Sequence, residues 1–204
     1  MTAAIVLAAG LSRRMGRFKL TLPWGGRTVI GQVVATLEAA SVDEVIVVTG
    51  HRTDEVAAAL AGTIAVTAHN PDYASGEMLS SIQAGLRVLA DRREPKPSPR
   101  PNEAAAVLLC LGDQPQMQAA TVQGVSAAGE ADGWRQIVIP SHRMRAGHPI
   151  LVPNWLWPEI LNCTSTLGDV MAAHRDRTRF LVVDTPTILA DLDTPEDYAA
   201  ATGR

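Results

Sequence analysis

The sequence AAIVLAAGLSRRMGRFK, residues 3–19, joins a short apolar run to a loop that is rich in glycine and arginine. The run Ala3–Leu7 has the length and composition of a buried β-strand. Behind it, Gly10 and Gly16 let the backbone approach a ligand closely and adopt positive φ. Four cations then fall within seven residues: Arg13, Arg14, Arg17 and Lys19. A strand that ends in such a loop is suited to holding a polyphosphate, and the plainer interpretation is a solvated basic turn.

Apolar runs of strand length alternate with helical patterns along the remainder of the chain. The further predicted strands cover residues 44–48, 64–68, 105–111, 137–139 and 181–183, and the predicted helices cover 29–37, 54–60, 78–89 and 195–201. This alternation predicts one α/β domain over residues 1–204, with a doubly wound, mostly parallel sheet and helices on both faces. In such sheets, ligands bind at the carboxyl ends of the strands. The proline-rich stretch 92–101, RREPKPSPRP, breaks the pattern and predicts a surface loop.

The composition argues against several classes of protein. An apolar fraction of 47% argues against disorder, and a net charge of −3 argues against a general nucleic-acid binder. No apolar stretch approaches the roughly 18 residues of a membrane span, and no secretory leader pattern is found. Cys110 and Cys163 are far apart and suggest neither a disulfide framework nor a zinc site, and Cys110 is expected in the core. We therefore expect a cytoplasmic protein that binds neither nucleic acid nor a membrane.

The glycine loop differs from the common nucleotide-binding loops. A P-loop reads G-x-x-x-x-G-K-[ST], whereas five residues separate Gly10 from Gly16 here and an arginine follows. A dinucleotide fingerprint needs G-x-G-x-x-G, and Gly10 has no glycine two residues further on. A second polar segment, GDQP at 112–115, ends the most apolar predicted strand. Its Asp113 is a candidate Mg²⁺ ligand at the same sheet edge, and the alternative is an ordinary Asx turn.

Two further carboxylates, Asp191 and Asp193, precede the last predicted helix. Alternate residues of an extended segment point the same way, so both side chains can face one site. Either Asp193 or Thr194 is expected to cap the helix, with Pro195 at its first position. Either Asp191 or Asp193 is then expected to complete a metal site with Asp113.

The loop resembles the L-A-A-G-x-S-x-R-M-G-x-x-K signature of the molybdenum-cofactor nucleotidyltransferases. Each fixed position of that signature is matched: Leu7, Ala8, Ala9, Gly10, Ser12, Arg14, Met15, Gly16 and Lys19. The resemblance extends to the G-D-x-P form of 112–115 and the D-x-D-T-P-E-D-Y form of 191–198. It implies a Rossmann variant like that of the nucleotide-diphospho-sugar transferases and an Mg²⁺-dependent transfer. It also implies Arg14, Lys19 and Asp113 as catalytic residues, with Asp113 holding the metal.

The same resemblance implies where the nucleotide and its acceptor bind. The residues implied to hold the nucleotide are Leu7, Ala8, Ala9, Gly10, Ser12, Arg14, Lys19, Gly76, Ser80 and Ser81. Segments 8–10 and 76–81 have the form seen in cytidylyl rather than guanylyl enzymes, and the plainer interpretation of the second is helix capping by Ser75. Gly147 and His148 resemble a G-H-P segment that lines the acceptor side, although His148 also fits a structural histidine before a strand.

The implied reaction joins CTP to a molybdopterin-type acceptor and releases pyrophosphate, and the implied partners include a molybdoenzyme or its insertion chaperone. One departure concerns the acceptor: many relatives carry G-D-x-G-A-R, whereas residues 168–173 read GDVMAA and resemble a helix. Two alternatives stay open. One is a transferase that uses GTP or another phosphorylated acceptor, and the other is a nucleotide-binding chaperone or sensor without turnover. A metal carboxylate together with Lys19 favours an enzyme.

Overall fold

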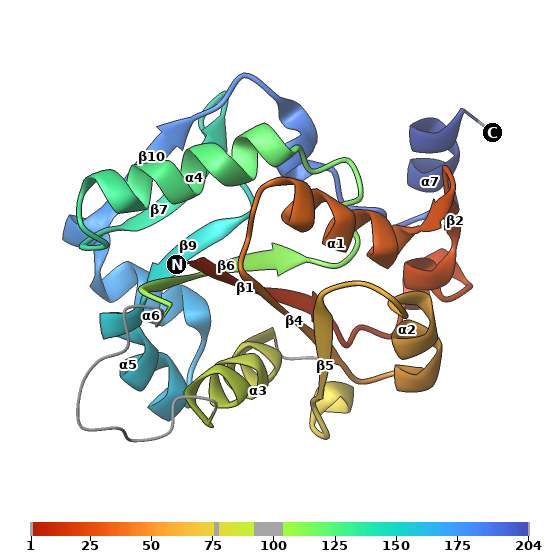
Figure 1. The fold of residues 1–204 in the computed structure, drawn as a ribbon, viewed down its shortest axis with the longest axis horizontal. Coiled ribbons are helices and arrows are strands. Elements are labelled where there is room, and N and C mark those ends of the chain that lie inside the picture. Colours follow the sequence, from red (N-terminus) through yellow and green to blue (C-terminus); the bar gives the residue numbers. More distant parts are fainter. Residues whose placement is uncertain (1, 76–77, 92–103, 204) are drawn as a thin grey trace.

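The computed structural model describes residues 2–75, 78–91 and 104–203, and eight strands of that part form one sheet (Figure 1). These strands are β1 (Thr2–Ala8), β4 (Glu44–Thr49), β5 (Ala65–His69), β6 (Ala106–Leu111), β7 (Ile137–His142), β8 (Arg145–Ala146), β9 (Ile150–Pro153) and β10 (Thr178–Val182). Their order across the sheet is β10-β7-β9-β6-β1-β4-β5, and the short β8 pairs with β7. A separate hairpin joins β2 (Pro23–Trp24) to β3 (Arg27–Thr28).

Within the eight-stranded sheet most strand pairs are parallel, which confirms the predicted fold class. β1 lies between β4 and β6 and is parallel to both, and the pairs β4–β5 and β7–β10 are also parallel. The exceptions are two strands missing from the predicted set: the short β8 is antiparallel to β7, and β9 is antiparallel to β6 and β7. The four residues of β9 form an apolar run too short to be recognised without knowledge of its neighbours.

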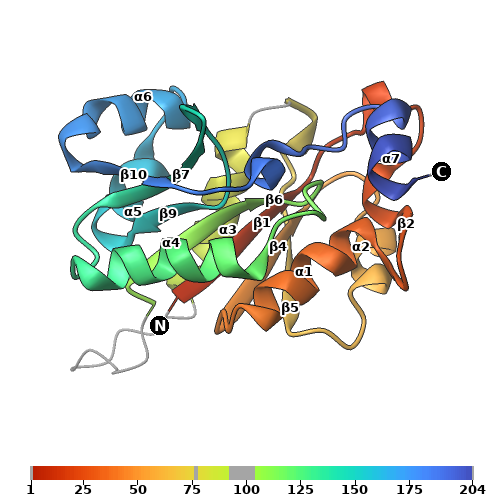
Figure 2. The same cartoon turned by 90° about the horizontal axis from the view of Figure 1, so that it is seen from above.

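Helices cover both faces of the sheet and bury its side chains in two core clusters. α1 (Val29–Ala39), α2 (Thr53–Ala59) and α4 (Ala119–Ala131) lie on one face, and α3 (Met78–Asp91), α5 (Trp157–Asn162) and α6 (Leu167–Ala173) lie on the other. Side chains of β1 alternate between the faces, because Ala4 and Val6 join the first cluster and Ala3 and Ile5 the second. α7 (Pro195–Thr202) packs beside the β2–β3 hairpin at one end of the molecule (Figures 1 and 2).

The predicted helices and strands are found with shifts of a few residues at their ends, and Cys110 is fully buried as expected. α4 was not predicted, because its alanine- and glycine-rich sequence has a weak amphipathic pattern. The proline-rich stretch 92–101 lies outside the described residues. In the described ranges, no helix combines the length and apolar character that a membrane span requires.

Candidate functional site

The glycine loop starts where β1 ends and contains two short 3₁₀ turns, Arg13–Met15 and Lys19–Thr21. Ser12 and Gly16 flank the first turn in the left-handed conformation, with φ of 52° and 68°. The Ser12 hydroxyl accepts a hydrogen bond from the backbone N–H of Lys19 at 3.3 Å. This bond closes the loop and fixes the base of the Lys19 side chain.

The positive φ expected at both glycines is found at Gly16 but not at Gly10. No atom lies within 4 Å of the place where a side chain at Gly10 would begin, so the backbone there borders open space. The far side of the loop is anchored by Met15, which is buried against Leu192 and Tyr198 near the C-terminus. The loop is therefore held on one side and open on the other.

Asp113 reaches the same edge of the sheet because β6 runs beside β1. The N–H of Gly112 donates to the carbonyl of Leu7 at 3.0 Å, and a Cβ at Gly112 would lie 2.9 Å from that oxygen. Only glycine permits this approach. The Asp113 carbonyl accepts a hydrogen bond from the N–H of Leu192 at 3.0 Å, which brings the C-terminal segment to the site.

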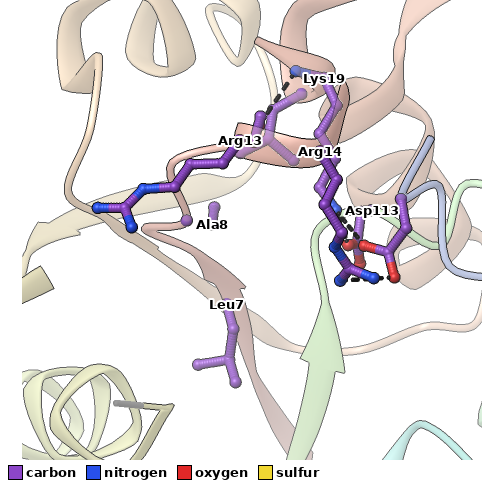
Figure 3. Close-up of a pocket in the computed structure, with 10 residues that line it drawn as sticks. Leu7, Ala8, Arg13, Arg14, Lys19 and Asp113 are labelled. Carbon is purple, nitrogen blue, oxygen red and sulfur yellow. Dashed lines mark hydrogen bonds and ion pairs between the residues drawn. The ribbon is translucent and has the colours of Figure 1, made fainter. Parts of the chain in front are cut away.

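Two cations and two carboxylates converge at this edge (Figure 3). The Nζ of Lys19 pairs with Oδ2 of Asp113 and, at 3.1 Å, with Oδ1 of Asp193. The second oxygen of Asp193, Oδ2, pairs with Nη2 of Arg14 at 2.9 Å. The Lys19 and Asp113 side chains are only 13% and 18% exposed, whereas the Arg14 side chain is 73% exposed. The pair of Lys19 and Asp113 is thus shielded from water, whereas the attraction between Arg14 and Asp193 is largely screened by solvent.

The electrostatics of the cluster keep Lys19 charged. Burial acts to lower the pKa of Lys19, but the charge of Asp113 and the hydrogen bonds to Asp113 and Asp193 outweigh it and raise that pKa. Lys19 is therefore an ammonium ion at neutral pH.

A cavity of about 190 Å³ opens beside the cluster. Among the residues predicted to bind the nucleotide or metal, those that line it are Leu7, Ala8, Gly10, Ser12, Arg14, Lys19, Asp113 and Asp193. Ala9 is buried and does not line it. Arg13 lines the cavity as well, but in Figure 3 its side chain extends away from Asp113, opposite to Arg14 and Lys19.

Asp191 lies near this cluster but outside its ion pairs. Its Oδ1 accepts a hydrogen bond at 2.6 Å from Nε2 of Gln114, which also donates to the carbonyl of Ile188 at 3.2 Å. Partial burial raises the pKa of Asp191, the charges of Asp113 and Asp193 add to this, and the Gln114 hydrogen bond opposes it. Sequence reasoning missed Gln114, and the one signal available was an amide residue directly after a candidate metal ligand.

The C-terminal helix resolves one alternative that the sequence left open. Thr194, not Asp193, caps α7: its hydroxyl accepts from the N–H of Asp197, and Pro195 occupies the first turn. Asp197 completes the capping box by accepting from the N–H of Thr194 at 2.8 Å. The side chain of Asp193 is thereby left to pair with Lys19 and Arg14.

The segment predicted to contact the base lies at the carboxyl end of β5 and the start of α3. Buried Asn70 donates from Nδ2 to the hydroxyls of Ser80 and Ser81 at 2.9 and 3.0 Å. Neither serine lines the cavity described above. Gly76 lies outside the described residues, so this part of the predicted nucleotide site stays a prediction.

The predicted acceptor residues lie where the chain turns into β9. A side chain at Gly147 would collide with the carbonyl of Ile188, to which the N–H of His148 donates at 3.1 Å. Burial lowers the pKa of His148 to about 4, against the opposing charge of Asp113. His148 is therefore a neutral imidazole at pH 7, and its role toward an acceptor stays a prediction.

The carboxylates suit magnesium, which usually takes one or two carboxylates together with waters and substrate phosphates. Asp113 and Asp193 are close enough to share the ammonium of Lys19, and they offer the hard oxygen ligands that this ion prefers. Within the described ranges, no three His, Cys, Asp or Glu side chains form a group able to hold a metal by themselves. The residues thus fit a partial metal site that substrate phosphates complete, and whether Asp191 or Asp193 is the second ligand stays a prediction.

The model of the MobA-like NTP transferase domain matches residues 4–191. The chain belongs to this family. The family expected from the glycine-loop signature is thereby confirmed, and the chain is a nucleotidyltransferase of the MobA-like family. The glycine loop and Asp113 fall within the matched range.

Three known proteins illustrate the relationship. The molybdenum cofactor cytidylyltransferase of Escherichia coli K12 is 29% identical over an alignment of 208 positions, which covers 98% of this chain and 95% of that protein. The structure of a nucleotidyl transferase from Methanothermobacter has a TM-score of 0.79 at 26% identity, covering 100% and 96% of the two chains. The structure of Rv0371c from Mycobacterium tuberculosis H37Rv in complex with manganese has a TM-score of 0.71 at 29% identity, covering 99% and 98%.

Proposed function

We propose that this protein transfers CMP from CTP to the phosphate of a molybdopterin-type cofactor and releases pyrophosphate. The observation that carries the proposal is the meeting of Lys19 and Asp113 at the carboxyl ends of neighbouring strands, beside an open glycine loop. The chain's similarity over almost its whole length to a molybdenum cofactor cytidylyltransferase supports the choice of substrates.

In the proposed reaction, an oxygen of the acceptor phosphate forms a bond to the α-phosphorus of CTP. The bond from that phosphorus to the bridging oxygen of the β-phosphate breaks, and pyrophosphate leaves with the electron pair. The acceptor phosphate is already anionic at neutral pH, so the protein needs neither a nucleophile nor a general base. Its task is to position the two phosphates and to stabilise the negative charge that develops.

Each element of the site has a role in that task. The open backbone at Gly10 and Ser12 approaches the phosphates, and the ammonium of Lys19 and guanidinium of Arg14 neutralise their charge. Asp113, with Asp193 or Asp191, would hold Mg²⁺, which supplies further charge neutralisation when bound. Ser80 and Ser81 would contact the cytosine together with Gly76, and Gly147 and His148 would border the acceptor.

Two alternatives are kept open by the same residues. A relative that uses GTP or another phosphorylated acceptor would share the phosphate loop and Asp113 and differ in the base or acceptor segment. A chaperone or sensor would bind nucleotide without turnover. The proposal further places the protein in the cytoplasm, with a molybdoenzyme or its insertion chaperone as the recipient of the product.

The deciding experiment measures pyrophosphate release with Mg²⁺ and each of CTP, GTP, ATP and UTP, with and without molybdopterin cofactor. We expect release with CTP only when the cofactor is present, and a cytosine dinucleotide as the second product. Release with GTP in preference to CTP would identify the first alternative. Nucleotide binding without release under any condition would identify the second.

A further inference from the structure

The acidic centre of the site is already neutralised by the protein's own cations. Lys19 bridges Asp113 and Asp193, and Arg14 takes the remaining oxygen of Asp193. Two positive charges thus face two negative ones. Because Lys19 and Asp113 are largely shielded from solvent, their pairing is far less screened than an ordinary surface ion pair.

The ammonium of Lys19 lies where a divalent ion would have to bind in order to use both carboxylates. An ion held by Asp113 and Asp193 needs an oxygen from each, and the Nζ of Lys19 contacts an oxygen of each. A divalent ion entering next to an unmoved ammonium would meet strong like-charge repulsion in a poorly hydrated site. Lys19 must therefore find another anionic partner before such an ion binds well.

The loop geometry indicates what that partner is. Lys19 is fixed at its backbone by the hydroxyl of Ser12, so the side chain can swing while its base stays in the loop. The same loop borders the cavity at Gly10 and Arg14, where nucleotide phosphates are proposed to bind. A phosphate in this cavity would offer Lys19 a new anion within reach of its four-carbon stem.

We propose that Lys19 is a resident counter-ion that excludes free divalent metal from Asp113 and Asp193 until nucleotide phosphates draw it away. The metal then enters with the nucleotide rather than before it. This inference rests on the proposed function, because it takes the cavity as the phosphate site. It assigns Lys19 a second role, in metal exclusion, besides the binding of phosphate.

The test is a titration of Mn²⁺ followed by electron paramagnetic resonance, without nucleotide, on the wild type and on Lys19→Met. We expect Lys19→Met to bind Mn²⁺ at least ~10-fold more tightly, because two carboxylates lose their shared cation. Lys19→Arg should keep Mn²⁺ binding weak, because it retains the charge. Arg17→Met is the matched control, since it removes a cation from the same loop that pairs with neither carboxylate among the described residues, and its affinity should stay within ~2-fold of the wild type.

A second titration adds CTP without acceptor. The wild type should gain much more Mn²⁺ affinity from CTP than Lys19→Met does, because only the wild type has an ammonium to displace. The wild-type measurement does not depend on the folding of any variant. If Lys19→Met fails to fold, Lys19→Gln replaces it in both titrations. Equal affinity of wild type and Lys19→Met for free Mn²⁺, or tight Mn²⁺ binding by the wild type without nucleotide, would overturn the inference.

The two proposals fail in distinguishable ways. CMP transfer by the wild type, together with an Mn²⁺ affinity of Lys19→Met equal to that of the wild type, overturns metal exclusion and leaves the enzyme assignment in place. Tighter Mn²⁺ binding by Lys19→Met, with no CMP transfer by the wild type, supports metal exclusion and overturns the proposed reaction.

Discussion

Asp113 acts through two different atoms, and a single substitution separates them. Its carboxylate pairs with Lys19, whereas its backbone carbonyl holds Leu192. Asp113→Asn removes the charge and keeps the backbone bond, so we expect a folded protein whose pyrophosphate release falls at least ~100-fold. Asp184→Asn, which alters an exposed carboxylate, is the control and should leave the rate unchanged. A near-wild-type rate for folded Asp113→Asn would contradict its role in the proposed metal site.

The two cysteines differ in their surroundings, and their reactivity reports on the core at the scale of single atoms. Cys110 is fully buried, and burial raises the pKa of its thiol to about 12, whereas Cys163 is partly exposed. Because the thiolate is the reactive form, only Cys163 should react with Ellman's reagent in the native protein. We expect one reactive thiol natively, two in guanidinium chloride, and none natively in Cys163→Ser. Reaction of the native Cys163→Ser variant would show that β6 is accessible.

At the scale of elements, α7 depends on its capping box for its position next to the site. Thr194→Ala removes the hydroxyl that the N–H of Asp197 donates to and should lower the free energy of unfolding by about 1 kcal/mol. Thr202→Ala, at the other end of α7, removes only a hydroxyl that donates to the carbonyl of Tyr198 one turn earlier, and it should change the free energy of unfolding by less than about 0.5 kcal/mol. Chemical denaturation of both variants decides between a cap that stabilises the protein and a helix that frays without effect.

The same cap gives a dependence on pH. Hydrogen bonds from the backbone and hydroxyl of Thr194 hold the pKa of Asp197 below its usual 3.8. Because the folded pKa is the lower one, this stabilisation is present above pH 3.8 and is lost as the pH falls below it. The unfolding free energy of Thr194→Ala should therefore fall less steeply with acid in that range than that of the wild type. Parallel curves would show that the hydroxyl of Thr194 does not contribute to the lowered pKa of Asp197.

The turn into β9 shows how one element is fitted against another. Gly147→Ala would place a Cβ against the carbonyl of Ile188 and disturb the segment that leads to Asp191 and Asp193, so we expect a loss of about 2 kcal/mol or more. Gly124→Ala in α4 is the matched control, because its Cβ meets Leu181 at an ordinary 3.7 Å. That variant should be stabilised by up to about 1 kcal/mol, because alanine favours helices. Stability is measured by thermal melts. An equal loss of stability in both variants would contradict the assigned contact.

At the scale of the whole molecule, the proposed nucleotide site is assembled from segments that are distant in sequence. The glycine loop follows β1, the predicted base segment precedes α3, and the carboxylates follow β6 and precede α7. We expect CTP to bind at least ~10-fold more tightly than GTP, because a pocket that hydrogen-bonds one base leaves polar groups unpaired with another. Calorimetric titration of the four NTPs with Mg²⁺ measures this, and tighter binding of GTP would refute the cytidylyl interpretation.

The sequence by itself determined the fold class, with its parallel strands, and the family to which the chain belongs. Short, continuous apolar runs can be recognised from composition. In a parallel sheet that is covered on both faces, a strand such as 105–111 needs apolar side chains on both sides. The signature from Leu7 to Lys19 pointed to the MobA-like family through residue types alone. A helix cap at Asp193 or Thr194 was predictable too, because a cap depends on neighbours three residues away, and the structure selects Thr194.

Only the tertiary structure decided which charges meet. That Lys19 pairs with Asp113 and Asp193, 94 and 174 residues away, follows from the parallel register of β1 and β6 and from the bond between Leu192 and Asp113. The antiparallel β9, the partial burial of His148 and the hydrogen bond from Gln114 to Asp191 likewise depend on packing between distant segments. A sequence pattern records local periodicity and residue type, whereas distances between charges are set by the fold.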